Sequence, residues 1–419
     1  MKPTLRILLH ILVFVLCCQC KKQEPSIKIS DSKLLRALIQ QGIDTNGDGI
    51  ISPAEAKVIT TLNLSGDSIS DMKGLEIFVN LSKLDCSFNQ LTSLNLSDNT
   101  VLTELNCNWN HLTNLIVNNN TNLRLLSCCD NPLTTLDVSN NLALEILYCE
   151  ATLMTSVDVS KNKALTQLSI ARGDFTNLDI SINTALYFLF CSDNPLAALD
   201  VSNNLGLRDL YCDSTKLTTL NISNNTSLEY LSCSNNQFVT LDVSKNTSLE
   251  GLNCSINQLT SLNLSQNTAL RHLQCGNNPL SAFDVSKNIS LEDMDCEYNQ
   301  LTSLNISNNT SLRILRCNNN PLSSLNVSNN IALEYLYCEN NQLITLDVSK
   351  NRVLRTLYCG SNQLTTLNVS KNAGLHKLSL TSMPSLHKVC VWKIPFPSTN
   401  VEVNITDSPN VYYSIDCIK

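Results

Sequence analysis

The stretch from residue 336 to residue 351, LYCENNQLITLDVSKN, contains the residue types that decide the fold of this chain. Apolar residues alternate with polar ones around Cys338, and a second alternating group follows at Leu346. Alternation with a period of two is typical of a short β-strand with one buried face. The stretch therefore predicts two short extended segments, with Cys338 facing inward in the first and with Asn341 and Asn351 at the turns.

The same unit recurs along most of the chain with one constant period, the spacing from Cys86 to Cys107 and from Cys107 to Cys128. Its central position, called the ladder position from here on, occurs 15 times and is occupied by Ile170, by Leu380 and otherwise by cysteine. The cysteines are Cys86, Cys107, Cys128, Cys149, Cys191, Cys212, Cys233, Cys254, Cys275, Cys296, Cys317, Cys338 and Cys359. An asparagine follows thirteen residues after each of the first 14 ladder positions, and another follows three residues after most of them. A strict period without insertions indicates stacked, equivalent turns.

The pattern L-x-x-L-x-C-x-x-N-x-L within each unit matches the leucine-rich repeat signature. We expect a β-rich leucine-rich repeat solenoid of about 15 repeats, with short parallel strands on one side and a second extended segment on the other. The ladder cysteines should be small buried packing residues, because aligned thiols have equivalent neighbours above and below and lack metal-ligand spacing. The asparagines should adopt left-handed backbone conformations and satisfy buried backbone groups of neighbouring turns.

The first residues, MKPTLRILLHILVFVLCCQCKK, predict a secretory signal over 1–19, because a basic start precedes a short apolar run. Three cysteines end this run, which favours a bacterial lipoprotein lipidated at Cys20, with Cys17 and Cys18 as alternatives. Plain secretion without a lipid remains open. The formal net charge is −7, and removal of Lys2 and Arg6 with the signal leaves 27 basic and 36 acidic residues, or −9. This acidic balance, without a basic run, argues against nucleic-acid binding.

Residues 44–55, DTNGDGIISPAE, match the EF-hand calcium loop pattern D-x-[DN]-x-[DN]-G-x5-E. Oxygen ligands for Ca²⁺ are expected from Asp44, Asn46, Asp48, Ile50, Ser52 and Glu55. The isoleucine would contribute its backbone carbonyl, and the glutamate both of its carboxylate oxygens. We expect one structural calcium ion at the start of the solenoid, while an ordinary turn without metal remains the alternative.

These features divide the chain into five parts. A signal peptide (1–19) precedes a lipid-anchor linker with a small helical, EF-hand-like calcium segment (20–60), an N-terminal cap of the solenoid (61–80), the solenoid (81–385) and a C-terminal cap (386–419). Apolar residues of the last part should cover the exposed end of the core. Cys390 and Cys417 lie outside the ladder of an exported chain, which predicts a disulfide between them.

The calcium loop followed by TLNLSGDSISDMKGLEIF and by the LxCxxNQLTSLDVSxNTxL units resembles exported leucine-rich repeat lipoproteins of Bacteroidetes-type bacteria, with internalin-like architecture. The resemblance covers nearly all of the mature chain. It implies attachment to the outer membrane or cell surface, here through the lipid alone, because no sorting domain or wall anchor is recognisable. It also implies adhesion to, or recognition of, a host or bacterial surface protein or glycan, without naming the ligand.

In leucine-rich repeats the strand residues that point away from the core form the concave face. On ladder positions 149 to 233 these residues are aromatic and charged, a composition found at binding hot spots. The predicted ligand-binding residues are Tyr148, Arg172, Phe188, Phe190, Asp193, Asp209, Tyr211, Asp213 and Tyr230. A sparser stripe consists of Tyr298, Tyr335, Tyr337 and Tyr358. The asparagine column is interrupted in the same region at Thr152, Gly173 and Thr215, and neutral drift is the alternative explanation for both features.

Catalysis is the second class of function to consider. The chain has five histidines, no recognisable nucleophile motif and no phosphate-binding loop. Asp209 and Asp213, with Asp193, resemble a paired-carboxylate site for glycan processing, but a flat solenoid face does not exclude water. We therefore expect a binding protein and not an enzyme, with a purely structural spacer or surface-layer component as the other alternative.

Overall fold

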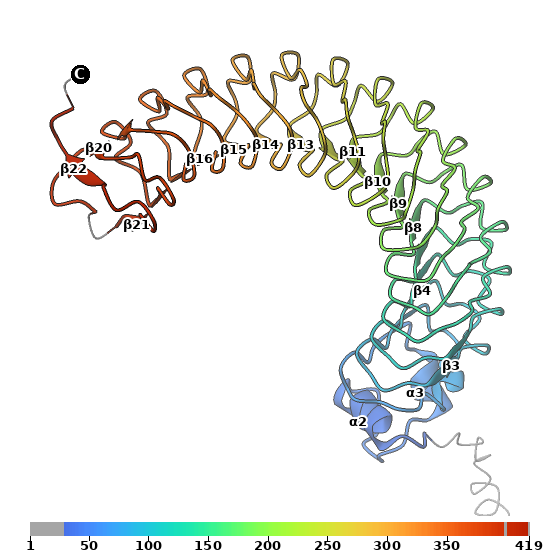
Figure 1. The fold of residues 1–419 in the computed structure, drawn as a ribbon. Coiled ribbons are helices and arrows are strands. Elements are labelled where there is room, and N and C mark those ends of the chain that lie inside the picture. Colours follow the sequence, from blue (N-terminus) through green and yellow to red (C-terminus); the bar gives the residue numbers. More distant parts are fainter. Residues whose placement is uncertain (1–28, 398–399, 418–419) are drawn as a thin grey trace, which may run out of the picture.

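The computed structural model describes residues 29–397 and 400–417, which form an open, curved solenoid (Figure 1). Two short helices lie at the N-terminal end of the arc, and the strands around β20 and β22 lie at the other end (Figure 1). The predicted signal peptide and Cys20 lie outside the described residues. The leucine-rich repeat architecture expected from the repeat period is confirmed.

The N-terminal segment is a helix, a loop and a second helix. Helix α2 (Ser32–Gln40) begins at Asp31, whose carboxylate accepts hydrogen bonds from the backbone N–H groups of Lys33 and Leu34. Helix α3 (Pro53–Lys57) begins with a capping box between Ser52 and Glu55. Both starts follow from the preference of Asp and Ser for the N-cap. Among the described residues, no helix is both long enough and apolar enough to cross a lipid bilayer.

A continuous parallel sheet of 17 three-residue strands lines the inner side of the arc (Figure 1). Its strands, in spatial order, are β1 (Thr61–Asn63), β2 (Lys83–Asp85), β4 (Glu104–Asn106), β6 (Leu125–Ser127), β7 (Ile146–Tyr148), β8 (Gln167–Ser169), β9 (Phe188–Phe190), β10 (Asp209–Tyr211), β11 (Tyr230–Ser232), β12 (Gly251–Asn253), β13 (His272–Gln274), β14 (Asp293–Asp295), β15 (Ile314–Arg316), β16 (Tyr335–Tyr337), β17 (Thr356–Tyr358), β19 (Lys377–Ser379) and β21 (Glu402–Asn404). The middle residue of each strand is apolar and pairs with the middle residue of the next.

The sheet has two strands more than the 15 ladder positions. Strand β1 precedes the first ladder position, and Leu62 pairs with Leu84, one residue further along the chain than the regular period would place its partner. Strand β21 follows the last ladder position, and Val403 pairs with Leu378 across a longer turn than the regular one. Each terminal turn thus adds a strand to the sheet, but the length of the turn differs from that of the regular repeats.

The second extended segment of each turn pairs only at the two ends of the solenoid. Near the N-terminus β3 (Ser93–Asn95) pairs with β5 (Asn114–Ile116), and near the C-terminus β20 (Lys388–Cys390) lies between β18 (Thr366–Asn368) and β22 (Tyr412–Ser414). Elsewhere in the described chain the segments form isolated bridges at most. The curvature explains why the second segments pair less than the inner strands do, because turns that hydrogen-bond on the inner side of an arc diverge on its outer side.

The ladder cysteines are packing residues, as predicted. All are fully buried free thiols. Some of these thiols donate weak hydrogen bonds across to the next strand: Cys107 Sγ lies 3.4 Å from the Ser127 carbonyl oxygen, and Cys149 Sγ lies 3.6 Å from that of Ser169. Burial raises the pKa of the Cys254 thiol to about 12, so the nucleophilic thiolate is absent at neutral pH.

The asparagines that follow three residues after a ladder position connect neighbouring turns. Asn278 is representative: its Nδ2 donates to the carbonyl oxygens of Cys254, Cys275 and Gly276 at 3.0, 3.1 and 3.2 Å. Its Oδ1 accepts from the backbone N–H of Leu259 at 3.0 Å. One buried amide thus satisfies four backbone groups in two turns, as predicted.

The predicted left-handed conformation of the asparagines is wrong. The residue immediately before the asparagine has the positive φ, as in Asn277 (56°), Trp109 (54°) and Asn319 (55°). The positive φ at this preceding residue changes the direction of the backbone after the strand. The asparagine that follows therefore points its amide into the core, where the unpaired backbone groups lie.

The second asparagine column bridges turns on the other side of the core. Asn246 Nδ2 donates to the carbonyl oxygens of Ile222 and Asn225 in the preceding turn, at 3.0 and 2.9 Å. The Oδ1 atoms of these asparagines, from Asn120 to Asn372, have no protein hydrogen-bond partner among the described residues. This column therefore supplies donors to neighbouring turns, whereas the first column supplies both donors and an acceptor.

The first column is interrupted where another group replaces the asparagine. Thr152 Oγ1 and Thr215 Oγ1 each donate to the carbonyl oxygen of the ladder cysteine in their own turn, at 3.2 and 2.7 Å. At Gly173 a Cβ atom would lie only 2.8 Å from the ring of the buried Phe175. Phe175 thus takes the space that an asparagine side chain needs.

The C-terminal turns cover the end of the core with aromatic side chains. The Phe396 ring packs against Trp392 and Tyr413, with ring centroids 5.2 and 4.9 Å apart. Cys390 and Cys417 are free thiols in this structure. Burial and a hydrogen bond with Cys390 raise the pKa of Cys417 to about 11, so the two thiols are neighbours. The disulfide between them stays a prediction.

We expect Asn278→Ala to lower the free energy of unfolding by about 2 to 4 kcal/mol, because it leaves a buried N–H and several buried carbonyls unpaired. Urea denaturation followed by far-UV circular dichroism measures the change. Asn308→Ala is the control, because Asn308 is exposed and donates a single bond, to the Ser286 carbonyl. Equal effects of both substitutions would show that the buried column does not hold the turns together.

Candidate functional site

The register of the sheet groups the predicted ligand-binding residues into rows on the concave face. Residues at the last position of each strand form one row, in which Tyr211 pairs with Phe190. Residues at the first position form a second row, in which Asp209 lies between Phe188 and Tyr230. Because the middle residue of each strand is buried, both rows point away from the core.

Phe188, Phe190, Tyr211 and Tyr230 form what we call the concave aromatic cluster, on strands β9 to β11. The Tyr211 ring lies 5.9 Å from Phe188 at 50° and 5.6 Å from Phe190 at 69°, between centroids. Tyr230 leans over Gly251, where a Cβ atom would lie 2.7 Å from its ring. Tyr211 and Tyr230 line a hollow of about 220 Å³ that extends to His272. The cluster thus presents half-buried and exposed rings around a shallow depression.

Burial and negative neighbours set the protonation of this surface. Burial, and then the Asp209 carboxylate, raise the pKa of Tyr211 above its usual value. Burial, and then Glu229, raise the pKa of Asp209. Tyr211 is therefore a neutral hydroxyl at physiological pH and offers both a donor and an acceptor beside an apolar ring.

Two of the predicted residues lie beside the cluster. Tyr148 donates a hydrogen bond to Gln167, whose amide in turn contacts the Tyr187 hydroxyl. Arg172 is exposed and directs its Nη2 towards Glu150 Oε2 at 3.4 Å. These contacts engage both side chains at the edge of the concave face.

Asp213 holds neighbouring turns together. Its Oδ1 accepts hydrogen bonds from the Ser232 hydroxyl at 2.6 Å and from the Ser234 backbone N–H and hydroxyl, both at 2.7 Å. Its Oδ2 accepts from the Ser192 hydroxyl at 3.2 Å. A carboxylate bound in this way is a structural anion. This arrangement argues against Asp213 as half of a catalytic carboxylate pair with Asp209.

The sequence reasoning missed several residues of this surface. His272 and Gln274 belong to the same two rows but lie two turns beyond the predicted patch. Following each row past ladder position 233 would have found them. Tyr187 comes just before strand β9 and lies outside the two rows. Its contact with Gln167 could therefore not be predicted from the repeat pattern. The sparser stripe named from the sequence was not missed: its Tyr337 and Tyr358 have ring centroids 5.3 Å apart further along the row.

The predicted calcium loop curls around Asp44. The Asp44 carboxylate accepts backbone N–H groups of Gly47, Asp48 and Gly49 at 2.8, 3.2 and 2.9 Å. Gly47 and Gly49 have φ of 71° and 77°, which a side chain rarely adopts. Asn46 Oδ1 accepts from the Asp48 N–H at 2.8 Å. The loop is thus ordered by its own polar side chains.

The same loop engages Glu55. Glu55 Oε1 accepts from the Thr45 N–H and hydroxyl at 2.8 and 2.9 Å, and Oε2 accepts from the Ser52 N–H and hydroxyl at 2.9 and 2.8 Å. Among the described residues, no group of three or more His, Cys, Asp or Glu side chains is gathered as a metal cluster. The oxygen donors of the loop suit a hard cation, but calcium would replace some hydrogen bonds of Glu55.

The fold and its buried columns define the class of protein: a leucine-rich repeat solenoid with a ladder of cysteines. No protein-family model matches the chain. The functional domain of InlJ from Listeria monocytogenes, whose structure is described as including a cysteine ladder, is 35% identical with a TM-score of 0.76. The match covers 82% of this chain and 79% of that domain. The chain therefore belongs to the internalin-type leucine-rich repeat proteins.

Two further comparisons find similar proteins. Internalin J from Listeria monocytogenes serotype 4b is 38% identical over 69 residues, which are 16% of this chain and only 7% of that protein. A leucine-rich repeat protein of Leptospira interrogans is 22% identical, with a TM-score of 0.66, over 84% of this chain and 97% of its own length. This second likeness concerns the fold. Solenoids of this kind present extended concave surfaces that typically serve recognition of other proteins.

The hydrogen bonds of Glu55 make the N-terminal segment sensitive to acid. Hydrogen bonds from Ser52, first of all from its backbone N–H, and then from Thr45 lower the pKa of Glu55 from 4.5 to about 2. A lowered folded-state pKa contributes stability above the unfolded pKa, and this stability is lost as pH falls through the folded value. We expect wild type to be more stable than Glu55→Gln at pH 6 and the difference to vanish between about pH 4.5 and pH 2.

Thermal unfolding of both proteins across this pH range measures the difference. Glu104→Gln is the control, because Glu104 makes an exposed ion pair with Lys83 that contributes little to stability. A difference in melting temperature between wild type and Glu55→Gln that persists unchanged at pH 2 would show that the ionisation of Glu55 does not cause the acid sensitivity.

Proposed function

We propose that this protein is an exported recognition protein of the bacterial surface, whose concave aromatic cluster binds a surface protein or glycan. The observation that carries the proposal is the group of rings on β9 to β11 around Tyr211. Half-buried and exposed aromatic side chains on a rigid sheet present a large contact area at a small cost in side-chain entropy. The internalin-type family supports recognition as the general role.

The proposed attachment is a lipid on Cys20 after cleavage of the signal 1–19, which would hold the chain at the outer membrane or cell surface. The support comes from the sequence, where three cysteines follow a short apolar run. The net charge of the mature chain, −9 from 27 basic and 36 acidic residues, suits an exposed and soluble ectodomain.

We assign the loop 44–55 to one structural Ca²⁺, held by Asp44, Asn46, Asp48, Ser52, Glu55 and the Ile50 carbonyl. The ion would neutralise the carboxylates that crowd this loop and brace α2 and α3 against the first turn. Extracellular calcium is plentiful, so a weak site would be occupied. Recognition does not depend on this ion, because the concave aromatic cluster lies many turns away along the arc.

We expect Phe190→Ala combined with Tyr211→Ala to weaken ligand binding at least about tenfold, because a central aromatic contact is typically worth about 2 kcal/mol or more. Binding is measured on a glycan array and on a panel of immobilised host extracellular-matrix proteins. Tyr337→Ala combined with Tyr358→Ala is the matched control, because these tyrosines occupy the same row of the sheet.

Unchanged binding by the Phe190 and Tyr211 double variant would remove the concave aromatic cluster as the site. A wild-type protein that binds nothing on either panel would favour the spacer or surface-layer role. Circular dichroism of each variant confirms that the solenoid is intact.

We expect millimolar CaCl₂ to raise the melting temperature of the wild-type protein by about 2 to 4 °C, because a ligand that binds only the folded state stabilises it. Asp48→Ala should abolish the shift, because it removes a carboxylate that would bind the calcium ion. Within the loop this carboxylate accepts one hydrogen bond, from the Ile50 N–H. Asp98→Ala, an exposed aspartate of the first repeat, should retain it. No shift in wild type, or an equal shift in Asp48→Ala, would contradict the site.

A further inference from the structure

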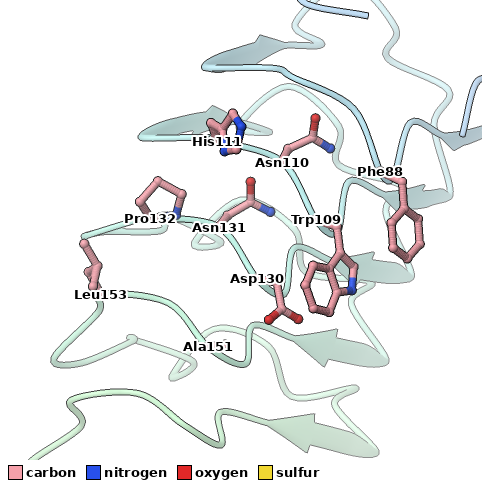
Figure 2. A pocket seen from close by; sticks show the side chains of 9 residues that line it. All are labelled: Phe88, Trp109, Asn110, His111, Asp130, Asn131, Pro132, Ala151 and Leu153. Carbon is pink, nitrogen blue, oxygen red and sulfur yellow. The ribbon is translucent and has the colours of Figure 1, made fainter. Parts of the chain in front are cut away.

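A second hollow lies at the edge of the N-terminal turns, away from the concave aromatic cluster. Its volume is about 610 Å³, compared with about 220 Å³ for the hollow beside Tyr230. Figure 2 shows two rows of side chains along it, with buried asparagines between them. The rows contain Phe88, Trp109 and Asp130 on one side and His111, Pro132 and Leu153 on the other. We call these six residues the edge pocket.

The two aromatic residues occupy positions that are unfavourable for them. Phe88 and Trp109 both have φ of 54°, at the place in the turn where most repeats have Asn, Asp or Ser. A bulky side chain at positive φ is strained. The two residues are 59% and 52% exposed, so burial does not compensate for this strain. Ile256 and Tyr298 are exposed at the same place of other turns, with φ of 54° and 49°, so what distinguishes Phe88 and Trp109 is that they lie on adjacent turns.

The rings form a platform that continues towards an acidic group. The ring planes of Phe88 and Trp109 are nearly parallel, at 7°, with centroids 5.8 Å apart. Asp130 is the next residue of the row, and Ala151 after it leaves the row open (Figure 2). The edge pocket thus places a flat indole ring beside a carboxylate.

The Asp130 carboxylate is poorly paired within the described chain. Its side chain is 17% exposed, and its one ion contact is a long one, 3.8 Å from its Oδ2 to Arg172 Nη2. The Arg172 guanidinium lies nearer to Glu150, at 3.4 Å. A half-buried carboxylate without a hydrogen-bond donor is unfavourable. A ligand that supplies such a donor would therefore gain a charge-assisted hydrogen bond.

The amides of the edge pocket are already engaged, which narrows the ligand class. Asn110 Nδ2 donates to the Cys86, Cys107 and Asn108 carbonyls, and its Oδ1 accepts from the Leu91 N–H. Asn131 donates and accepts in the same way one turn further on. The groups left to a ligand are one carboxylate, one imidazole, the Trp109 indole N–H and apolar surface. A polyhydroxylated sugar finds few partners there, whereas a flat cation finds both a ring face and a counter-ion.

We propose that the edge pocket binds an arginine side chain of a protein or peptide partner. The guanidinium stacks on Trp109 and donates to Asp130, while apolar neighbours in the partner cover Pro132 and Leu153. Arginine fits better than lysine because its planar group stacks on an aromatic face and donates in a fixed fork. The acidic net charge of −7 favours the approach of a basic partner. This site is independent of the concave aromatic cluster.

The test uses the full chain labelled with 5-fluorotryptophan and observed by fluorine NMR. The chain has two tryptophans, Trp109 and Trp392, and Trp392→Phe assigns the two signals. The probes are acetylated and amidated Leu-Arg-Leu and its counterparts with citrulline or leucine in the centre. Citrulline keeps the shape of arginine without its charge. We expect the arginine peptide to shift the Trp109 signal and the citrulline peptide to bind at least about tenfold more weakly.

Asp130→Asn should weaken binding of the arginine peptide by a similar factor, because it removes the negative charge and keeps a residue that tolerates positive φ. Asp407→Asn is the matched control: Asp407 has φ of 58° at the same place in the last turn and is exposed. Its affinity should equal that of wild type.

Several results would overturn the proposal. Equal affinity for the citrulline or leucine peptide would identify a purely apolar groove. A Trp109 shift with a neutral trisaccharide at lower concentration than with the arginine peptide would identify a glycan site. An unaffected Asp130→Asn variant, or no shift with the arginine peptide at millimolar concentration, would remove the arginine site.

Discussion

The structure depends on how a short turn satisfies backbone polar groups that it buries. Each repeat leaves its strand after three residues, so the carbonyls beside each ladder position have no neighbour in a regular sheet. The buried amide of an asparagine such as Asn278 satisfies three of these carbonyls and one N–H. Because these bonds reach into the preceding turn, the amides also set the stacking. The narrow core then selects cysteine as its repeated apolar residue.

The same arrangement separates stability from recognition. Inward positions are occupied by Leu, Cys and Asn, whereas outward positions of the strands contact mainly their neighbours along a row. Tyr211 and Phe190 can thus vary without disturbing the core, and Phe88 and Trp109 can occupy strained positions whose backbone is set by the turn. A rigid scaffold of this kind tolerates local strain, because the strain is small compared with the cooperativity of the stack.

Much of the fold could be predicted from one repeat. The period predicted parallel strands, the buried cysteines and the asparagine bonds between turns, because each is a local rule applied many times. The backbone conformation of the asparagines was predicted wrongly, since Asn favours positive φ in general while this turn requires it one residue earlier. The strand rows brought Phe190 and Tyr211 together as expected, but the hydrogen bonds of Asp213 depend on serines in other turns.

The sequence by itself determined the period, the identity of the inward residues and the placement of aromatic side chains on outward rows. It did so because each inward residue meets the same environment in every turn. Only the tertiary structure decided which outward groups remain available to a ligand. Asp213 and Asp130 are both aspartates within two residues of a ladder cysteine, yet three hydroxyls and a backbone N–H hold the first. The second makes one ion contact at 3.8 Å. Such differences arise between turns, where side chains distant in the sequence share one surface.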